Sequence, residues 1–360
     1  MDVEATPEKA RPNLAAVAAL AGVSPSTASL AFSGSGPVSA ATRTRVLAAA
    51  AQLDYAGPDP RAQSLRRGRS GIIGVVIEDR LRDAFRDPMN IAMLDGIADE
   101  TGSLGAGILL LTENGEGAAS IRNAPVDAVV LIGCSTSFAA QVAIFRQRGI
   151  ALVAIEAEPM DDVLAIDLDN RQASHTLARH LAGLGHRRVA IVSLPLDADR
   201  SRGPLTEAAI EAATEAATGY TARERIHGVR EVFAGSSGVS AAVSSIEEGL
   251  VAGLGLLADP GTRPSAVIAQ SDLLAVGVIR AAEQLGLAVP ADLSIVGFDG
   301  VKLEGLAPYD LTTMVQPAVD KGRAAGRAVI ALLSGEHPQA VSFTSRFHRG
   351  TTTAPPRVAS

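Results

Sequence analysis

Apolar residues recur at three- and four-residue spacing near the start of the chain. This spacing predicts a short helix whose buried face is formed by Leu14, Val17, Ala18 and Ala21. Gly22 follows directly, at a position where a helix end favours a left-handed residue, and Val23 returns to the core. Ser24 can then cap a second helix, with Pro25 at its first position, where a missing N–H costs nothing.

The second helix is expected to bury Ala28 and Phe32. Its outward face carries Ser26, Thr27, Ser29 and Leu30. A third helix begins at a Ser39 cap, and its predicted buried residues are Val46, Leu47, Ala50 and Leu53. The first two helices have the spacing of a helix-turn-helix, the unit that places its second helix in the DNA major groove. A helical hairpin inside another kind of domain is the alternative interpretation.

From Gly71 onward, short apolar runs alternate with longer helical stretches. The runs predict strands at 72–77, 108–111, 129–132, 151–155, 189–192, 266–269 and 293–296. Helices are predicted near 91–101, 138–148, 171–183, 239–257, 272–285 and 319–333. Strands buried on both faces and separated by helices indicate an α/β fold with parallel sheets, and the number of strands fits two such sheets.

Three segments of the body lack this regular pattern. Residues 196–224 are interpreted as a surface loop followed by helix, and residues 235–240 as a flexible turn into another helix. The tail over 351–360 is expected to be disordered.

Composition narrows the class of protein. A chain of 360 residues suggests two or three domains, with an ordinary globular balance of 47% hydrophobic and 20% charged residues. No apolar run reaches membrane-spanning length, and the N-terminus lacks a signal-peptide pattern. The single Cys134 excludes an internal disulfide framework and fits a reducing compartment. We therefore expect a cytoplasmic protein with no membrane partner.

The net charge of −7 is unevenly distributed. The basic residues within 1–70 are Lys9, Arg11, Arg43, Arg45, Arg61, Arg66, Arg67 and Arg69. The acidic residues there are Asp2, Glu4, Glu8, Asp54 and Asp59. The N-terminal region is thus basic and the rest acidic, which suits phosphate binding by the former while the acidic part limits nonspecific binding.

The chain resembles the lactose-repressor family of bacterial transcription regulators in a series of short motifs. The N-terminal matches are Val17-Ala18, Ala21-Gly-Val-Ser24, Thr27-Ala-Ser29, Val38-Ser39, Thr42-Arg43, Arg45–Ala50, Arg61–Gly68 and Ile73–Val76. Later matches are Val126–Val130, Asp169-Asn-Arg171, Leu184–Ala190, Ser271–Gly277, Val289–Asp299 and Leu311–Met314. They occur in family order over nearly the whole chain.

The resemblance implies three parts. These are a helix-turn-helix domain at 1–57, a hinge at 58–70, and a body at 71–360 with the two-lobed periplasmic-binding-protein-like fold. The first lobe is expected at about 71–182 and 317–336, and the second at about 183–316 and 337–356. A ligand cleft is expected between the lobes.

The resemblance also implies which residues contact DNA. The positions that read base edges are Pro25, Ser26 and Leu30. Many relatives carry a polar residue where Leu30 stands; leucine cannot hydrogen-bond a base but can pack on a thymine methyl group. Hydroxyls suited to phosphate contacts belong to Ser24, Thr27, Ser29 and Ser33. Helix capping or plain solvent exposure is the alternative for each hydroxyl.

The hinge is the second implied DNA-binding element. Pro58 and Pro60 flank the start of Arg61–Gly68, a segment too short to hold a helix alone. By resemblance it folds beside its dimer mate over the minor groove, with Leu65 as a wedge between base steps and Arg66 next to it. A plain basic linker is the alternative.

The wedge interpretation gives a first prediction. Leu65→Ala is expected to weaken sequence-specific DNA binding strongly and to leave nonspecific, salt-sensitive binding nearly unchanged, because only specific binding needs the kinked duplex. Titrations on specific and scrambled duplexes over a series of salt concentrations measure both. Equal loss of the two affinities would contradict the wedge role.

Candidate effector residues follow strands of the body. Asp169 and Asp299 each come after a predicted strand, as does Ser271, and ligand sites in open α/β sheets lie at these strand ends. Arg225 matches a family arginine at the start of a helix. Two carboxylates, a guanidinium and a hydroxyl suit a polyhydroxylated ligand such as a sugar or nucleoside. A helix cap or an interlobe salt bridge is the alternative for each carboxylate.

Two features leave the ligand's class open. The chain has no Trp and only 3% aromatic residues, so rings that stack on sugar faces are scarce. The loop at 78–88 has Phe85 as its only aromatic residue, and its arginines are Arg80, Arg82 and Arg86. These arginines either bind a more polar or anionic ligand or are simply solvated.

The sequence therefore predicts a homodimeric transcriptional regulator, a repressor. It binds double-stranded operator DNA of pseudo-palindromic sequence, and a small-molecule effector controls that affinity. No cofactor is implied, and no nucleophile elbow, phosphate loop or metal-spaced cluster points to an enzyme. The alternative is a solute-binding protein or a sugar-sensing module without regulatory DNA binding.

Overall fold

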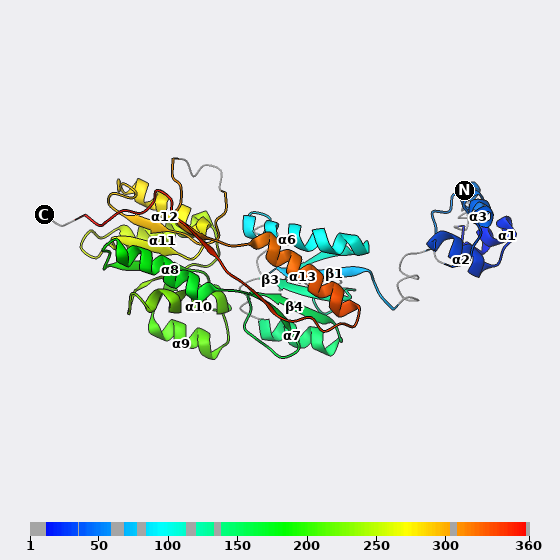
Figure 1. Cartoon of the computed structure of the whole chain (residues 1–360), viewed down its shortest axis with the longest axis horizontal. Helices are drawn as coiled ribbons and strands as arrows, with labels where there is room; N and C mark the ends of the chain where they lie inside the picture. Colours follow the sequence, from blue (N-terminus) through cyan, green and yellow to red (C-terminus); the bar gives the residue numbers. More distant parts are fainter. Residues whose placement is uncertain are drawn as a thin grey trace, which may run out of the picture. The chain divides into compact units, whose positions relative to one another are not determined.

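The computed structural model describes residues 12–34, 36–58, 68–77, 84–112, 120–132, 138–302 and 308–357. These residues fall into two units, a head within Met1–Ser70 and a body within Gly71–Ser360 (Figure 1). No single helix in these ranges is long and apolar enough to cross a membrane.

The head is formed by three helices in its described part: α1 (Leu14–Ala21), α2 (Pro25–Ser33) and α3 (Ala40–Gln52). Each begins at a side chain that accepts the N–H three residues further on; these capping residues are Asn13, Ser24 and Ser39. Gly22 and Gly34 end the first two helices in the left-handed conformation. α1 and α2 meet at 100°, within the range typical of a helix-turn-helix.

One small core holds the head together. Its buried residues are Val17, Ala18, Ala28, Ala31, Val46, Ala49 and Ala50. The Phe32 ring packs edge-on against Tyr55, with ring centroids 5.8 Å apart, so the chain after α3 returns to α2. The prediction that Leu47 is buried was wrong: its side chain is 44% exposed. Ala49 is buried instead, because it lies one turn beyond Val46 on the face toward α1 and α2.

The first lobe of the body is built on a parallel sheet with strand order β12-β5-β4-β3-β1-β2. Its strands are β1 (Ile72–Ile77), β2 (Gly107–Thr112), β3 (Ala128–Ile132), β4 (Ala151–Ile155), β5 (Leu164–Leu168) and β12 (Val341–Phe343). Its helices are α6 (Pro88–Thr101), η1 (Gly102–Leu104), α7 (Phe138–Gln147) and α13 (Ala318–Leu333). Ile73, Val75 and Ile77 join the core under α6 and α13, whereas Val76 joins the core under α7. Helices therefore cover both faces of the sheet.

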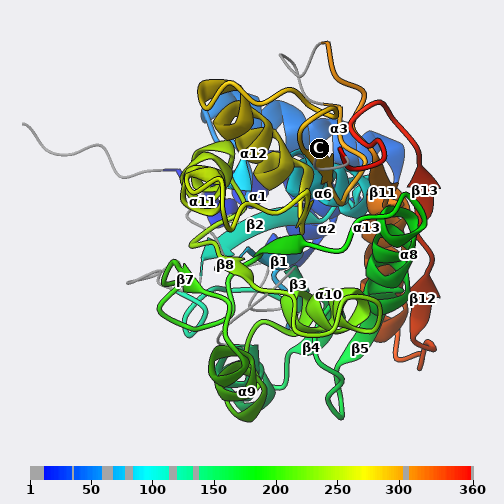
Figure 2. The same cartoon turned by 90° about the vertical axis from the view of Figure 1, so that its left-hand side faces the viewer.

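The second lobe has a sheet with strand order β10-β9-β6-β8-β7, in which only the β7–β8 pair is antiparallel. Its strands are β6 (Val189–Ser193), β7 (Gly203–Pro204), β8 (Gly238–Ser240), β9 (Ala266–Ala269) and β10 (Ser294–Val296). Its helices are α8 (Asn170–Gly183), α9 (Glu207–Glu215), α10 (Tyr220–Arg230), α11 (Ile246–Leu257) and α12 (Asp272–Gln284). Figure 2 shows α11 and α12 side by side on one side of the lobe, and α8 and α10 on the other. The short pair β11 (Thr313–Val315) and β13 (Arg346–His348) completes it.

The lobe limits differ from those expected from sequence. α8, which was assigned to the first lobe, packs against α10, and its residues Ala173, Leu177 and Leu181 lie in the core of the second lobe. β12, which was assigned to the second lobe, pairs with β5 in the first. The chain thus crosses between lobes close to residues 168–170, 315–318 and 343–346. Apolar periodicity shows which face of a helix is buried, but not which sheet buries it.

The C-terminal segment was also predicted wrongly. Its backbone runs along β10, where Ile295 N–H donates to the Thr352 carbonyl at 2.9 Å. The Thr352 hydroxyl is fully buried and donates to the Ile295 carbonyl at 2.7 Å. The first residues of this segment are therefore held to the second lobe, and residues 358–360 lie outside the described residues.

Two further elements begin elsewhere than expected. The predicted helix at 239–257 begins only at Ile246, because Gly238–Ser240 forms β8 instead of a flexible turn. The helix predicted within 196–224 is split into α9 and the start of α10.

Glycines let three helix pairs approach backbone to backbone. A Cβ on Gly322 of α13 would overlap the Met93 carbonyl of α6, and one on Gly228 of α10 would overlap the Arg171 carbonyl of α8. In α11, a Cβ on Gly249 would overlap the Leu274 carbonyl of α12. Each of these three close approaches is possible only because glycine has no side chain.

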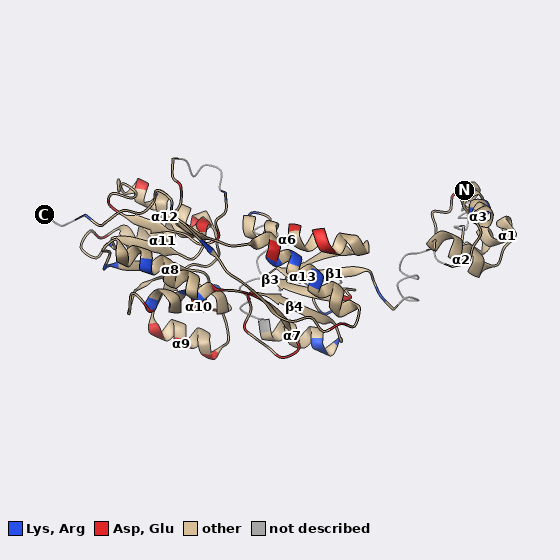
Figure 3. Cartoon of the chain, viewed as in Figure 1, with Lys and Arg blue, Asp and Glu red and all other residues tan. Residues whose placement is uncertain are grey.

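Figure 3 shows acidic residues of α6 beside basic residues of α13, where Arg323 and Asp99 pair at 2.8 Å.

This packing gives a second prediction. Gly249→Ala is expected to lower the free energy of unfolding by about 1–3 kcal/mol, because the methyl group forces α11 away from α12. The matched control is Gly255→Ala in the same helix, where a Cβ meets no atom within 4 Å. That variant should be neutral or gain up to about 1 kcal/mol. Urea denaturation of both variants measures the difference, and equal effects would contradict the close approach.

Candidate DNA-contacting face and interlobe site

The start of α2 carries the residues predicted to contact DNA. Ser24 Oγ accepts the Thr27 N–H at 3.1 Å and so caps the helix, and it lies 2.9 Å from the Thr27 hydroxyl, with which it forms a hydrogen bond. The Ser33 hydroxyl donates to the Leu30 carbonyl at 3.2 Å. For Ser24 the structure shows the capping that was named as the alternative to phosphate contact, whereas Thr27 and Ser33 form local hydrogen bonds.

Four of the predicted residues, Ser33 among them, form one stripe along α2. Ser26, Ser29, Leu30 and Ser33 have the spacing of a single helix face. Pro25 and Ser26 are exposed, and Leu30 is 37% exposed. The stripe offers hydroxyls and one apolar side chain and no charged group, so it suits close contact with base edges and methyl groups. Leu65 and Arg66 lie outside the described residues.

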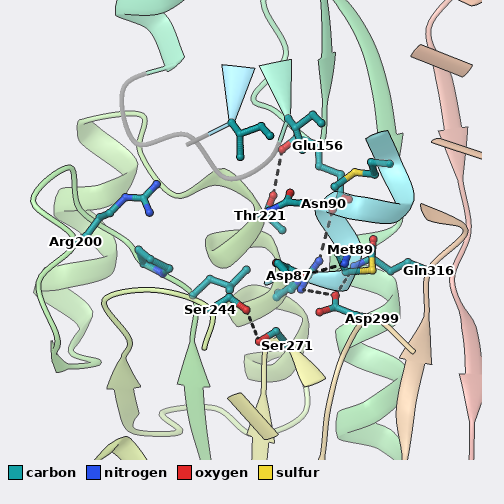
Figure 4. Close-up of a pocket in the computed structure, with 16 residues that line it drawn as sticks. Asp87, Met89, Asn90, Glu156, Arg200, Thr221, Ser244, Ser271, Asp299 and Gln316 are labelled. Carbon is teal, nitrogen blue, oxygen red and sulfur yellow. Dashed lines mark hydrogen bonds and ion pairs between the residues drawn. The ribbon is translucent and has the colours of Figure 1, made fainter. Parts of the chain in front are cut away.

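In the body, a cavity of about 100 Å³ lies between the two lobes (Figure 4). The first lobe contributes Asp87, Met89 and Asn90 from the start of α6, and Glu156 from the end of β4. The second lobe contributes Thr221, Arg225, Ser244, Ser271 and Asp299. Gln316, on a crossing between the lobes, and Arg200 of the second lobe complete the polar lining. The lining therefore contains side chains from both lobes.

Glu156 is the centre of a buried polar network beside this cavity. Its carboxylate pairs with the Lys321 ammonium, which is fully buried in α13, and accepts from Asn170 Nδ2 at 2.8 Å. Thr221 donates its hydroxyl to the Glu156 carbonyl at 3.1 Å. Burial alone would raise the pKa of Glu156, but Lys321 and Arg225 outweigh it and hold the pKa below its ordinary value. A charged Glu156 thus ties the first lobe to α8 and α10 of the second.

Arg225 holds the second-lobe side of the network. Its Nε donates to Asn170 Oδ1 at 2.8 Å, and its other nitrogens lie 3.5 Å from Glu156 and 3.8 Å from Asp299. The guanidinium also lies 3.7 Å from the centroid of the Phe298 ring, a cation–π contact. Since the side chain is almost fully buried, these partners fix its position at the cavity wall.

Two neighbouring carboxyls titrate abnormally. Burial raises the pKa of Asp299 well above its usual value; Arg225 opposes this, and the charges of Asp272 and Asp87 add to it. Asp299 accepts from the Gln316 amide at 2.6 Å. Burial also raises the pKa of Asp272, to about 7, against the hydrogen bonds that it accepts from Thr313, Val301 and Gly300. A protonated Asp299 can donate a hydrogen bond to a ligand.

The other predicted effector residues are divided. Ser271 caps α12 at the cavity wall, and its hydroxyl accepts from Ser244 at 2.8 Å. Asp169 is not among the lining residues. Its carboxylate accepts from the backbone and the hydroxyl of Ser345 at 2.8 Å each, at a lobe crossing. The structure thus brings Arg225, Ser271 and Asp299 together at the cavity, whereas Asp169 bonds to Ser345, which is neither the helix cap nor the interlobe salt bridge named as its alternatives.

Known proteins match both units. Residues 13–57 match the family model of bacterial regulatory proteins of the lacI family, and residues 178–352 match that of the periplasmic binding protein-like domain. The HTH-type transcriptional regulator IpsA of Corynebacterium glutamicum is 32% identical, over 95% of this chain and 97% of that protein. The chain belongs to the lacI family of bacterial regulatory proteins.

Other relatives of this lacI-family protein agree. The HTH-type transcriptional repressor CytR of Escherichia coli is 28% identical over 89% of each chain. The crystal structure of the lac repressor dimer bound to operator and an anti-inducer has a TM-score of 0.74 at 22% identity, over 95% of this chain and 99% of that one. That likeness shows the α/β fold with two sheets and an N-terminal helix-turn-helix.

Several polar residues of this lacI-family site were missed from sequence. Glu156 follows the strand at 151–155 directly, so the strand-end rule that selected Asp299 would also have selected it. Gln316 and Lys321 could not be identified from sequence, because only the folding of the chain brings them close to the other residues of the site. Within the described residues, no group of three or more His, Cys, Asp or Glu could hold a metal ion.

The raised pKa of Asp272 gives a third prediction. The folded state holds its proton up to about pH 7, whereas an unfolded carboxyl loses it near pH 4, so this group stabilises the fold at low pH and loses that contribution as pH rises toward 7. Asp272→Asn is expected to reduce the fall in melting temperature between pH 5 and pH 8. An asparagine can keep its oxygen on the Gly300 and Val301 N–H groups and donate to the Thr313 hydroxyl. Identical pH profiles for the variant and the parent would contradict the assignment.

Proposed function

We propose that this protein is a transcriptional repressor whose affinity for operator DNA is set by a small molecule in the interlobe cavity. The observation that carries the proposal is the combination of an N-terminal helix-turn-helix unit with a polar cavity lined by both lobes of a separate body. Two copies bind a pseudo-palindromic operator, as the lac repressor dimer is bound to its operator. As a regulator of chromosomal genes it acts in the cytoplasm, and it performs no catalysis.

DNA recognition resides in the outward stripe of α2. Ser26 and Leu30 meet base edges, Leu30 through a thymine methyl group, and Ser29 and Ser33 lie toward the sugar-phosphate backbone. The Ser24 and Thr27 hydroxyls hold the helix start in place. The hinge residues Leu65 and Arg66 add contacts in the minor groove.

Effector control uses the network around Glu156 and Arg225. These side chains join the lobes and line the cavity, so a ligand that bonds to them favours one lobe arrangement over another. Coupling of this kind is typically about 1–3 kcal/mol, or roughly 5–150-fold in operator affinity. Ser271, Asp299 and Arg225 bind the ligand directly, and Asp169 stabilises the lobe crossing at Ser345.

The cavity favours a polyhydroxylated effector. Its described polar lining consists of amides, hydroxyls, carboxyls and two guanidinium groups; Arg225 is buried against Glu156 and Asp299, and Arg200 is half-buried. Because burial raises the pKa of Asp299, its carboxyl group is suited to donate a hydrogen bond to a ligand hydroxyl. This arrangement suits a sugar ring or a nucleoside.

Fluorescence anisotropy on near-palindromic DNA from upstream of the gene tests the proposal. Titrations are run with and without a panel of sugars and nucleosides, against scrambled DNA at equal salt. We expect specific binding that one compound of the panel changes at least fivefold. Ligand binding without specific DNA binding would favour the solute-binding alternative and overturn the repressor.

A further inference from the structure

A second cavity lies next to the interlobe cavity. Its volume is about 670 Å³, within the range of about 300–1,000 Å³ that is common for ligand pockets. At three places in the chain, one residue lines the interlobe cavity and its direct neighbour lines the second cavity. These pairs are Ser271 and Asp272, Asp299 and Gly300, and Gln316 and Val315. A single layer of backbone therefore separates the two cavities. We call the second one the crossing cavity, because Val315 and Arg346 line it where the chain crosses between the lobes.

The two-stranded ribbon of β11 and β13 forms one wall of the crossing cavity. In its register Thr313 lies opposite His348, and Val315 lies opposite Arg346. Residues two apart in a strand lie on the same face, so these four side chains share one face of the ribbon, and all four line the cavity. The other face carries Met314, which is buried in the core of the second lobe beside α8 (Figure 2). The ribbon thus turns two basic side chains toward the crossing cavity.

The crossing cavity offers positive charge to a ligand. The side chains of Lys302 and Arg346 are exposed, and within the part of the chain that the structure describes they form no hydrogen bond or ion pair. Its two carboxyl groups are already engaged. Asp310 pairs with His348 at 2.8 Å, and the buried Asp272 accepts three hydrogen bonds from its own surroundings. Two cations therefore remain for a bound anion.

These groups suit a small organic anion. A guanidinium can donate two parallel hydrogen bonds to a carboxylate or a phosphate, and the Lys302 ammonium adds a second positive charge. Leu311 and Val315 give the cavity an apolar part, which an inorganic anion would leave uncovered. The lining therefore favours a metabolite that joins a carbon skeleton to a carboxylate or phosphate group.

The backbone between the two cavities is strained at Asp299. Its φ is 121°, in the region that residues other than glycine rarely adopt, and its N–H donates to the Met314 carbonyl at 2.8 Å. Gly300 packs so closely on Val315 that a Cβ would come within 2.7 Å of it. Val301 packs against the core of the first lobe. A ligand in the crossing cavity thus acts on the same segment, from the other side, as a ligand beside the Asp299 carboxyl.

We propose that the crossing cavity is a second regulatory site, which binds a small organic anion with a carboxylate or phosphate group. Arg346 and Lys302 hold the oxyanion, and the carbon skeleton lies against Leu311 and Val315. Through the segment at 299–301 the anion favours one lobe arrangement and so alters operator affinity. Binding of the anion does not depend on the proposed function, whereas its effect on operator affinity rests on it.

Calorimetric titration of the full chain with defined anions tests binding. The compounds are succinate, citrate, glycerol 3-phosphate, phosphoenolpyruvate and orthophosphate, all at constant ionic strength in sodium chloride. At least one organic anion is expected to bind with one equivalent per chain and about tenfold more tightly than orthophosphate. Whether the carboxylates or the phosphate esters bind more tightly identifies the group that Arg346 prefers. A panel in which no organic anion binds more tightly than orthophosphate would overturn the proposal.

Three arginine variants locate the bound anion. Arg346→Ala is expected to weaken its binding about tenfold or more, because a charged hydrogen-bond partner is lost, and Arg346→Lys should recover part of this loss. The matched control is Arg280→Ala, which removes an exposed arginine of α12 outside the cavity and should leave the affinity unchanged. Melting temperatures are measured alongside. If Arg200→Ala in the interlobe cavity weakened binding and Arg346→Ala did not, the anion would lie in the interlobe cavity and the proposal would be wrong.

Anisotropy titrations on operator DNA at constant ionic strength test the regulatory effect. The anion is expected to change the operator affinity of the parent protein about fivefold or more, and that of Arg346→Ala less than twofold. Anion binding that leaves the operator affinity of the parent unchanged would contradict a regulatory site. A parent protein that binds the anion but selects no operator would contradict the proposed function and leave the binding site standing.

Discussion

Replacing Lys321 by methionine is expected to lower the free energy of unfolding of the body by about 3–5 kcal/mol. The Lys321 ammonium is fully buried and pairs with Glu156 and Gln316. Its loss leaves the Glu156 carboxylate buried with only the more distant Arg225 as a cationic partner, 3.5 Å away. Urea denaturation followed by circular dichroism measures the change.

Two further variants make this result specific. Glu156→Gln combined with Lys321→Met removes both charges and should recover a large part of the loss, because no unpaired carboxylate remains. Arg323 lies in the same helix as Lys321 and forms an exposed ion pair with Asp99 of α6. Arg323→Met breaks this pair and should cost no more than about 1 kcal/mol. Similar losses for Lys321→Met and Arg323→Met would show that the buried pair does not hold the site together.

Val46→Asp is expected to abolish sequence-specific DNA binding, with at least a 100-fold loss of affinity, and to leave the thermal transition of the body unchanged. Val46 is fully buried in the small core of the head, and a domain of this size has only a few kcal/mol to lose. A buried, unpaired carboxylate exceeds that margin. Specific binding typically exceeds nonspecific binding by at least about 10³, so unfolding of α2 would be clearly visible.

Ala48→Asp is the matched control for this result. It adds the same charge to the exposed side of α3, two residues away, without entering the core. Anisotropy titrations on one duplex and scanning calorimetry of both variants give the two readouts. Equal loss of DNA binding in Ala48→Asp would mean that the added charge, and not unfolding of the head, causes the effect.

Much of the fold could be predicted because the strands are continuous apolar runs. β1, β4 and β9 have the bounds expected from sequence. β5 was missed because Asp167 interrupts its apolar run. β8 was missed because it has only three residues, and its glycine and serine are typical of a turn. The caps at Ser24 and Ser39 were predicted correctly, since a cap depends only on residues nearby in sequence.

The site could be predicted only in part. Ser271 and Asp299 follow strands and do line the cavity, but the same rule selected Asp169, whose carboxylate turns to Ser345. The strand-end rule places a residue at an edge of the sheet and leaves the direction of its side chain open. In the sequence pattern of α13, Lys321 is only one of several polar residues. The burial of its side chain depends on where α13 crosses the sheet, which the pattern does not show.

We propose that the head selects a two-fold symmetric DNA sequence and that the body responds to a ligand. Selection of duplexes from a random library by the full chain, followed by sequencing, tests it most directly. We expect enrichment of a pseudo-palindrome by the parent protein, loss of that enrichment in Val46→Asp, and a change in its strength with one compound of the panel of sugars and nucleosides. A library that stays random at every salt concentration at which the parent protein still binds DNA would contradict it.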